Sequence, residues 1–350
     1  MNLIDYGFVP TMMPEDVSGI PARITAVHKE RYELVCEYGY TFGRLKTSIY
    51  YAGGFEDFPT AGDFVLIDYN PDGDSRIVKT LKRKSFFSRR NPTPGKGEQA
   101  VAANFDYVFV MQSLNHDFNL RRMERYVTLA WQSGAVHVIV LTKADLVEDC
   151  SEQVLASQKV APGVEVYAIS TITGFGLDVL KDYLKPCKTV VFLGSSGVGK
   201  SSLVNALAEQ EIMAVGDIRE DDSKGRHTTT HRQLIMLPGG AMIIDTPGMR
   251  ELGMLDDVSV GLGETFSDVV SYLGRCKFSD CRHQTEPGCA IRAAIERGEL
   301  PKERWESYLK LKREANFSDD KEGYLRQKQQ WSKEIAKWSK KMKKNGGIRK

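Results

Sequence analysis

Short apolar runs separated by glycine and proline dominate the chain up to about residue 82. The runs are rich in β-branched and aromatic residues and alternate with polar positions, which predicts short strands. The predicted strands span 21–28, 32–37, 41–46, 63–69 and 75–81. Five short strands in about sixty residues predict a small β-barrel, of which the OB-fold is the commonest kind. A small β-domain that serves only for packing is the alternative.

The pattern changes near residue 106, where apolar runs begin to alternate with segments of helical periodicity. Strands are predicted at 107–112, 136–141, 164–169, 189–193 and 241–244. Helices are predicted at 120–132, 177–184 and 200–208. Strands that alternate with helices predict a mostly parallel sheet with helices on both faces.

Two further segments differ from both regions. Residues 84–100 are basic and rich in proline and glycine, so we interpret them as a linker, with contact to RNA phosphates as the alternative. Residues 301–315 predict a helix with proline in its first turn. A basic helix is predicted at 324–344.

Charge is unevenly distributed, although the formal net charge is only +2. Residues 301–350 contain 16 lysines and arginines against 7 acidic residues, a net charge of +9, so the other 300 residues carry −7. A basic tail on an acidic body indicates a polyanionic partner. The chain has no apolar run of membrane-spanning length and its N-terminus lacks the pattern of a secretory signal, so we expect a cytoplasmic protein that does not bind membranes. Nothing in the sequence suggests an obligate dimer, so we expect a monomer.

A glycine-rich segment between the strand at 189–193 and the helix at 200–208 matches the phosphate-binding P-loop pattern. Its glycines allow backbone N–H groups to face a β-phosphate. We expect Lys200 to neutralise the β- and γ-oxygens and Ser201 to offer its hydroxyl to Mg²⁺. The expected nucleotide-binding residues of this segment are Gly194, Ser195, Ser196, Gly197, Val198, Gly199, Lys200, Ser201 and Ser202.

Asp245 follows the strand at 241–244 and begins the sequence Asp-Thr-Pro-Gly. We expect its carboxylate to hold Mg²⁺ through water and the N–H of Gly248 to sense a γ-phosphate. The segment 225–231, Gly-Arg-His-Thr-Thr-Thr-His, has the character of a switch. Its threonines compete for the remaining Mg²⁺ position; we favour Thr229 over Thr228 and Thr230.

The catalytic equipment is incomplete. Many GTPases have a glutamine after Asp-Thr-Pro-Gly that orients the attacking water, whereas this chain has Met249. Hydrolysis should therefore be slow unless another group helps. His227 is our candidate for that group, alongside Lys200 and Thr229, although packing or RNA binding by His227 remains equally open.

A base-recognition motif, Thr142-Lys143-Ala144-Asp145, follows the strand at 136–141. The Asp145 carboxylate can accept hydrogen bonds from guanine N1–H and its exocyclic amine, a donor pair that adenine lacks, so GTP is preferred over ATP. The Lys143 stem can lie over the base. Thr142 replaces the usual asparagine, which should weaken one contact.

A second base-binding segment is predicted on a neighbouring strand. Ser170 and Thr171 follow the strand at 164–169 and fit a loop that closes over guanine from the other side. By themselves these two residues would be a weak signal.

These motifs stand in a rotated order. A conventional GTPase begins with its P-loop and ends with its guanine motif, whereas here Asp145 precedes Lys200 by about fifty residues and Asp245 comes last. A rotated motif order keeps the same nucleotide site in space but moves the ends of the chain. The chain therefore leads from Asp245 directly towards the C-terminal region, which a γ-phosphate-dependent movement could pull.

Three cysteines and one histidine lie within fourteen residues near the C-terminus. Three thiolates and one imidazole form a complete tetrahedral set, which predicts one structural Zn²⁺ whose binding helps to fold the module. The expected ligands are Cys276, Cys281, His283 and Cys289. Disulfide bonding is less suitable, because an odd number of cysteines leaves one over.

Together these residues resemble the ribosome small-subunit-dependent GTPase A family (RsgA/YjeQ). The resemblance rests on the rotated motif order, the segments 225–230 and 245–252 and the four zinc ligands, and it covers about 18–315. It implies an N-terminal OB-fold, a circularly permuted P-loop GTPase domain and a C-terminal zinc domain. It also implies ribosome-stimulated GTP hydrolysis in late maturation of the small ribosomal subunit, and a part in hydrolysis for His227.

The expected fold is therefore a multidomain α/β protein. Its predicted parts are 1–83, an OB-fold RNA-binding domain; 84–100, a basic linker; 101–270, the permuted GTPase domain; and 271–350, a zinc-binding α-helical domain with a basic helical tail. The expected ligands and partners are GTP or GDP with Mg²⁺, one Zn²⁺, and the small ribosomal subunit with its rRNA.

The tail helix and the overall function each keep alternatives. Trp331, Ile335, Trp338 and Met342 share one predicted face among lysines; RNA binding is favoured over a solvated docked helix or a membrane-surface helix. A nucleotide-sensing binder with negligible turnover is the main alternative to an assembly GTPase, because Met249 cannot orient water. An ATPase or nucleotide kinase is disfavoured by Lys143 and Asp145.

Overall fold

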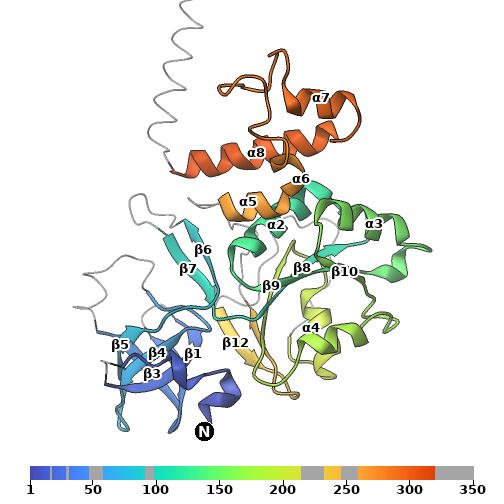
Figure 1. The fold of residues 1–350 in the computed structure, drawn as a ribbon. Helices are drawn as coiled ribbons and strands as arrows, with labels where there is room; N and C mark the ends of the chain where they lie inside the picture. Colours follow the sequence, from blue (N-terminus) through green and yellow to red (C-terminus); the bar gives the residue numbers. More distant parts are fainter. Residues whose placement is uncertain are drawn as a thin grey trace, which may run out of the picture. The chain divides into compact units, whose positions relative to one another are not determined.

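The computed structural model describes residues 1–15, 18–28, 31–46, 58–90, 98–213, 232–245 and 259–319. The described residues form two compact units. One contains everything up to 245 together with 259–271, and the other contains 272–319. The predicted barrel and GTPase region therefore lie in a single unit (Figure 1).

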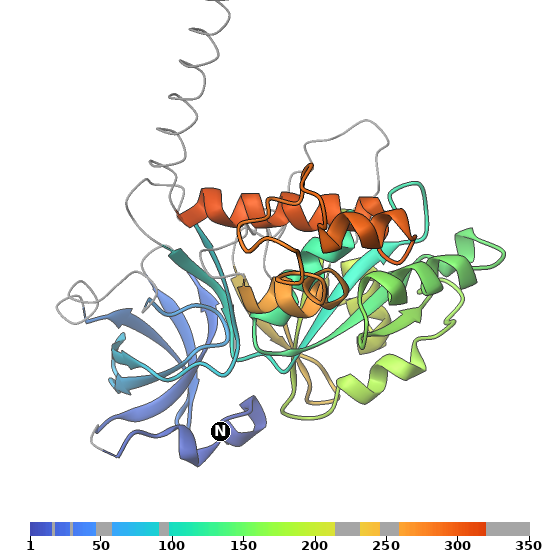
Figure 2. The same ribbon diagram turned by 45° about the horizontal axis from the view of Figure 1, so that its top comes forward.

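A five-stranded barrel occupies the N-terminal part of the first unit (Figure 2). Its strands are β1 (Ile20–Val27), β2 (Tyr32–Cys36), β3 (Gly39–Leu45), β4 (Phe64–Asp68) and β5 (Ser75–Thr80). They pair in the order β1-β2-β3-β5-β4, and a β4–β1 pairing closes the barrel. All pairs are antiparallel except β3–β5. The interior is apolar, with Ile24, Leu34 and Ile77 fully buried. The prediction of an OB-like barrel is confirmed.

The segment 84–100 is not simply a linker. It contributes β6 (Phe86–Arg90) and the first half of the opposite strand β7 (Glu98–Ala103), which pair as an antiparallel ribbon. Phe87 is buried and stacks on Phe105 with ring centroids 4.9 Å apart. The basic and Pro/Gly-rich composition obscured this anchoring side chain, and residues 91–97, which suggested the linker most strongly, lie outside the described residues.

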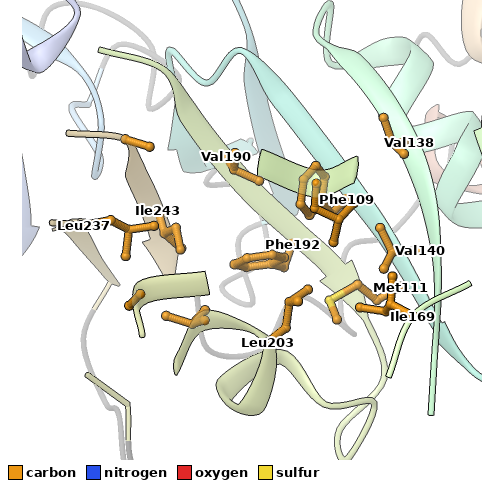
Figure 3. Close-up of a cluster of buried hydrophobic side chains, with 14 of the residues drawn as sticks. Phe109, Met111, Val138, Val140, Ile169, Val190, Phe192, Leu203, Leu237 and Ile243 are labelled. Carbon is orange, nitrogen blue, oxygen red and sulfur yellow. The ribbon is translucent and has the colours of Figure 1, made fainter. Parts of the chain in front are cut away.

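The GTPase region contains five parallel strands in the order β10-β9-β8-β11-β13. Their bounds are β8 (Tyr107–Ser113), β9 (Val136–Thr142), β10 (Glu165–Ala168), β11 (Thr189–Gly194) and β13 (Met242–Asp245). β12 (Arg232–Met236), which the sequence pattern did not predict, pairs antiparallel with β13. Buried side chains of these strands, such as Phe109, Phe192 and Ile243, pack against Leu203 of a covering helix (Figure 3).

Helices cover this sheet on both faces (Figures 1 and 2). α2 (Leu120–Gln132) and α3 (Ser151–Val160) lie on one face, and α4 (Lys200–Ala208) lies on the other. The predicted helix at 177–184 is the 3₁₀ helix η5 (Asp178–Tyr183). α5 (Ser259–Thr265) packs against α2, and α6 (Ser267–Val270) follows it.

The barrel and the parallel sheet are hydrogen-bonded to each other. β1 pairs antiparallel with β12, with Ala26 opposite Gln233 and Val27 opposite Arg232. This pairing joins all the barrel and GTPase strands except β6 and β7 into one eleven-stranded sheet. The barrel is therefore built into the sheet rather than tethered beside it.

Arg23 on β1 is buried where the barrel meets the sheet. Its guanidinium donates to the carbonyl oxygens of Tyr6, Gly62 and Asn104 and to the hydroxyl of Thr189 at the start of β11. Burial lowers its pKa to about 10, partly offset by the carboxylates of Asp106 and Asp63. The side chain therefore stays charged at neutral pH and links the barrel to the P-loop strand.

The second unit contains α7 (Ala290–Glu296) and α8 (Lys302–Asp319). α8 corresponds to the helix predicted at 301–315 and continues past it. The predicted tail helix at 324–344 lies outside the described residues. Within the described part of the chain, no helix combines the length and apolarity needed to cross a bilayer.

Candidate nucleotide site and metal centre

The nucleotide motifs meet at the carboxyl edge of the parallel sheet. On one side of β11 the neighbours are β8 and β9, which come earlier in the chain, and on the other side are β13 and β12, which come later. Strand order thus reverses between β8 and β11, the position at which open α/β sheets bind ligands. The rotated motif order is compatible with one site because these strands are neighbours in space.

The P-loop links β11 to α4 with a backbone that depends on glycine. Gly197 and Gly199 have φ angles of 71° and 99°, which non-glycine residues rarely adopt. Val198 between them is buried and anchors the loop. Lys200 begins α4, so Ser201 and Ser202 lie in its first turn. The positive end of this helix and the loop N–H groups together suit a phosphate.

The two guanine segments are hydrogen-bonded to each other. Lys143 adopts a left-handed conformation with φ 60°, and the N–H of Ala144 donates to the Ile169 carbonyl at 3.0 Å. The Ser170 hydroxyl donates to the Asp145 carboxylate. The same hydroxyl accepts the N–H groups of Ile172 and Thr173, each at 3.2 Å. Asp145 is exposed and therefore accessible to a ligand, and Thr171 lies in the loop beside it.

Thr142 connects the guanine motif to the P-loop. Its buried hydroxyl donates to the Val198 carbonyl at 2.6 Å. From the sequence we expected threonine at this position to weaken a contact. The short hydroxyl is nevertheless sufficient to join β9 to the phosphate loop.

A pocket of about 520 Å³ opens beside the P-loop at this edge. Of the predicted nucleotide-binding residues it includes Lys143, Ser195, Ser196 and Gly197. It also includes residues that the motifs did not indicate: Ser113, Asn115, His116, Asp117, Arg122 and Tyr126. Ser113 ends β8 and the next three follow it, so the edge rule, applied to every strand, would have found these four.

The remaining predicted nucleotide residues divide into two groups. Asp245 ends β13, which is the neighbour of β11, and so lies at the same sheet edge as the P-loop. Gly248, Met249, His227 and Thr228, Thr229 and Thr230 lie outside the described residues.

The predicted metal ligands of the second unit converge on one point. The Nδ1 atom of His283 lies 3.4 Å from the Sγ atoms of Cys276 and Cys289 and 3.7 Å from that of Cys281. All four donor atoms lie within 4.8 Å of one another. Tetrahedral Zn²⁺ with its usual bond lengths places such atoms roughly 3.5–3.8 Å apart, so the donor set fits zinc.

Backbone hydrogen bonds to Glu286 shape the loop that carries His283. Glu286 accepts the N–H groups of Arg282, Gln284 and Thr285 at 2.8–3.1 Å. Its own backbone N–H and these three N–H groups lower the pKa of its carboxylate to about 2. His283, inside this loop, has φ 59°. Burial lowers the pKa of His283, which favours the neutral imidazole that metals bind.

Comparison with known proteins identifies the family. The family model described as RsgA GTPase matches residues 80–255. The small ribosomal subunit biogenesis GTPase RsgA 2 of Listeria monocytogenes is 45% identical over 319 residues, covering 91% of this chain and 90% of that protein. RsgA of Methanosarcina acetivorans is 46% identical over 264 residues, with 75% and 71% covered.

Two solved structures share the architecture. YjeQ from Thermotoga maritima aligns with a TM-score of 0.61 at 27% identity, covering 85% of this chain and 98% of that one. YloQ, described as a circularly permuted GTPase, aligns with a TM-score of 0.56 at 23% identity, covering 87% and 97%, and supports the fold. With the family model, the long alignments and the permuted sheet in agreement, this chain belongs to the RsgA family of GTPases.

Proposed function

We propose that this chain binds GTP across the β8–β11 edge and hydrolyses it to GDP and phosphate while bound to the small ribosomal subunit during late maturation. The observation that carries the proposal is the contact of Thr142 with the Val198 carbonyl. It joins a guanine-reading segment to a phosphate-binding loop in one site. The relatives' names supply the ribosomal partner.

Each predicted residue has a specific role in this proposal. Lys200 and the P-loop N–H groups hold the phosphates, and Asp145 selects guanine. Ser201, Thr229 and Asp245 would hold Mg²⁺, which neutralises charge on the phosphates when bound. His227 assists the attacking water, and Gly248 responds to the γ-phosphate. Docking on the ribosome would complete a catalytic site that lacks a water-orienting glutamine. Because the ribosome is the partner, the activity would be cytoplasmic.

We also propose that the barrel is an RNA-binding surface. Tyr40, Phe42 and Arg44 alternate along β3, so their side chains share its outer face. The Arg31 guanidinium lies 3.7 Å from the Phe42 ring centroid, and Tyr38 stacks on Tyr69. Exposed aromatic and arginine side chains on an OB-like barrel are suited to stacking unpaired bases. The basic C-terminal tail would add phosphate contacts.

GTP hydrolysis tests the function directly. We expect the purified chain to hydrolyse GTP slowly and small ribosomal subunits to raise the rate at least tenfold. A tenfold increase corresponds to about 1.4 kcal/mol of additional transition-state stabilisation. ATP should not be hydrolysed, and large subunits serve as the matched control. Tight GTP binding without stimulation would favour a nucleotide-sensing binder instead.

Metal removal tests the proposed structural zinc. A chelator that competes for Zn²⁺ should unfold the second unit, because metal binding contributes folding free energy there. The fluorescence of Trp305, whose ring packs edge-on against His283 at 5.4 Å, reports the change. GTP binding by the first unit should persist. Elemental analysis that finds no zinc in the native protein would contradict the assignment.

A further inference from the structure

An acidic side chain occupies the pocket beside the phosphate loop. The Asp117 carboxylate accepts a hydrogen bond from the Ser195 hydroxyl at 3.1 Å. Both residues line the pocket. A negative charge next to a polyphosphate site opposes ligand binding, so Asp117 requires a compensating charge.

Arg122 supplies that charge with a two-pronged contact. Its two terminal nitrogens lie 3.1 Å and 2.9 Å from the two carboxylate oxygens of Asp117, and one of them also donates to the Asp117 carbonyl. This fork geometry is the strong form of an arginine–carboxylate pair. Arg122 lies in the first turn of α2, where a cation is unfavourable to the helix dipole. Its position is therefore better explained by Asp117 than by helix stability.

The pair is held by the end of β8. The side chain of Gln112 donates to the Asn119 carbonyl at 3.0 Å and accepts the Asn119 N–H at 2.9 Å. The Asn119 side chain then caps α2 by accepting the N–H of Arg122 at 3.0 Å. Asn115 accepts the N–H of Asp117 at 3.0 Å. A strand end and a helix start thus fix both members of the pair.

We propose that Asp117 is a positioning residue that anchors the P-loop through Ser195, and that Arg122 neutralises it so that the anchor does not repel GTP. This inference rests on the proposed GTP site. Without Arg122 the carboxylate is uncompensated and repels both nucleotides. GTP carries one more negative charge than GDP and is repelled more. The pair therefore contributes to the balance between the two nucleotides.

Binding of fluorescent GTP and GDP analogues to the full chain with Mg²⁺ tests the charge balance. Arg122→Ala should lower GTP affinity roughly two- to fivefold more than GDP affinity, a range set by the energy of partly exposed pairs. Adding Asp117→Asn should restore the ratio, and Arg122→Lys should largely keep it. High salt should shrink the effect of Arg122→Ala. Arg121→Ala, one residue earlier and outside the pocket, is the matched control.

Two outcomes would overturn the proposal. Equal loss of GTP and GDP affinity in Arg122→Ala would indicate a merely structural arginine, and failure of Asp117→Asn to restore the ratio would exclude charge compensation. If Arg122→Ala does not fold, as judged by its thermal transition, Arg122→Gln replaces it. A wild-type chain that binds neither nucleotide would instead refute the proposed GTP site.

Discussion

The hydroxyl of Thr142 links two parts of the proposed nucleotide site. A hydroxyl at this position reaches the Val198 carbonyl because β9 and the P-loop approach each other closely. The guanine motif and the phosphate loop are thereby held at a fixed spacing. A longer amide side chain is therefore not required for this contact.

Thr142→Val should break this link while preserving side-chain shape. It leaves the buried Val198 carbonyl without its donor, so we expect a loss of about 1–3 kcal/mol in stability and weaker GTP binding. Thr142→Ser keeps the hydroxyl and should stay close to wild type. Chemical denaturation and GTP titration of both variants measure the effect, and equal behaviour of the two would show that the hydroxyl does not matter.

Site residues that form a motif with fixed spacing could be predicted from the sequence. The predicted zinc ligands, among them Cys276 and His283, converge in the structure because a tetrahedral set leaves few arrangements for residues so close in the chain. Asp117 follows β8, so the edge rule could have placed it at the site, but its contacts with Ser195 and Arg122 depend on the path of a polar loop and on the P-loop of another strand. No local pattern encodes those contacts.

Among the elements, helix α5 packs closely against α2 because Gly261 has no side chain. A Cβ on Gly261 would lie 2.3 Å from the carbonyl oxygen of Thr128 on α2. The Thr128 hydroxyl also lies 3.1 Å from that of Thr265. The two helices therefore approach at backbone distance, and α5 is held firmly although it is only seven residues long.

Gly261→Ala should force α5 away from α2. We expect destabilisation of about 1–3 kcal/mol from overpacking. Gly263 lies on the same helix with nothing within 4 Å of its virtual Cβ. Gly263→Ala should therefore stabilise the protein, by up to about 1 kcal/mol from helix propensity. Thermal unfolding of the pair measures the difference, and similar shifts in both variants would contradict the close approach.

Elements with strong periodicity were predicted well, and those set by tertiary contact were not. α2 was predicted at its observed bounds because its apolar face is regular. β6 was assigned to a linker because its arginines and the nearby prolines outweighed Phe87. β12 was missed because its identity as a strand depends on β13 and β1 on either side.

At the scale of the whole molecule, Arg23 fastens the barrel to the GTPase sheet. Arg23→Met should destabilise the chain by about 3 kcal/mol, because several buried acceptors lose their donor. Arg76→Met, at an exposed position of β5, should change stability by less than about 0.5 kcal/mol. Denaturant unfolding followed by two spectroscopic probes measures both variants. Unchanged stability of Arg23→Met would show that the interface does not need the cation.

The pairing of β1 with β12 also has a consequence for solubility. Without the barrel, β12 would be the outermost strand of the GTPase sheet, with a row of unpaired backbone N–H and C=O groups. Such edges recruit strands from other molecules and promote aggregation. The N-terminal barrel therefore shields the GTPase sheet from self-association, and a fragment that begins after the barrel would have to protect that edge in another way.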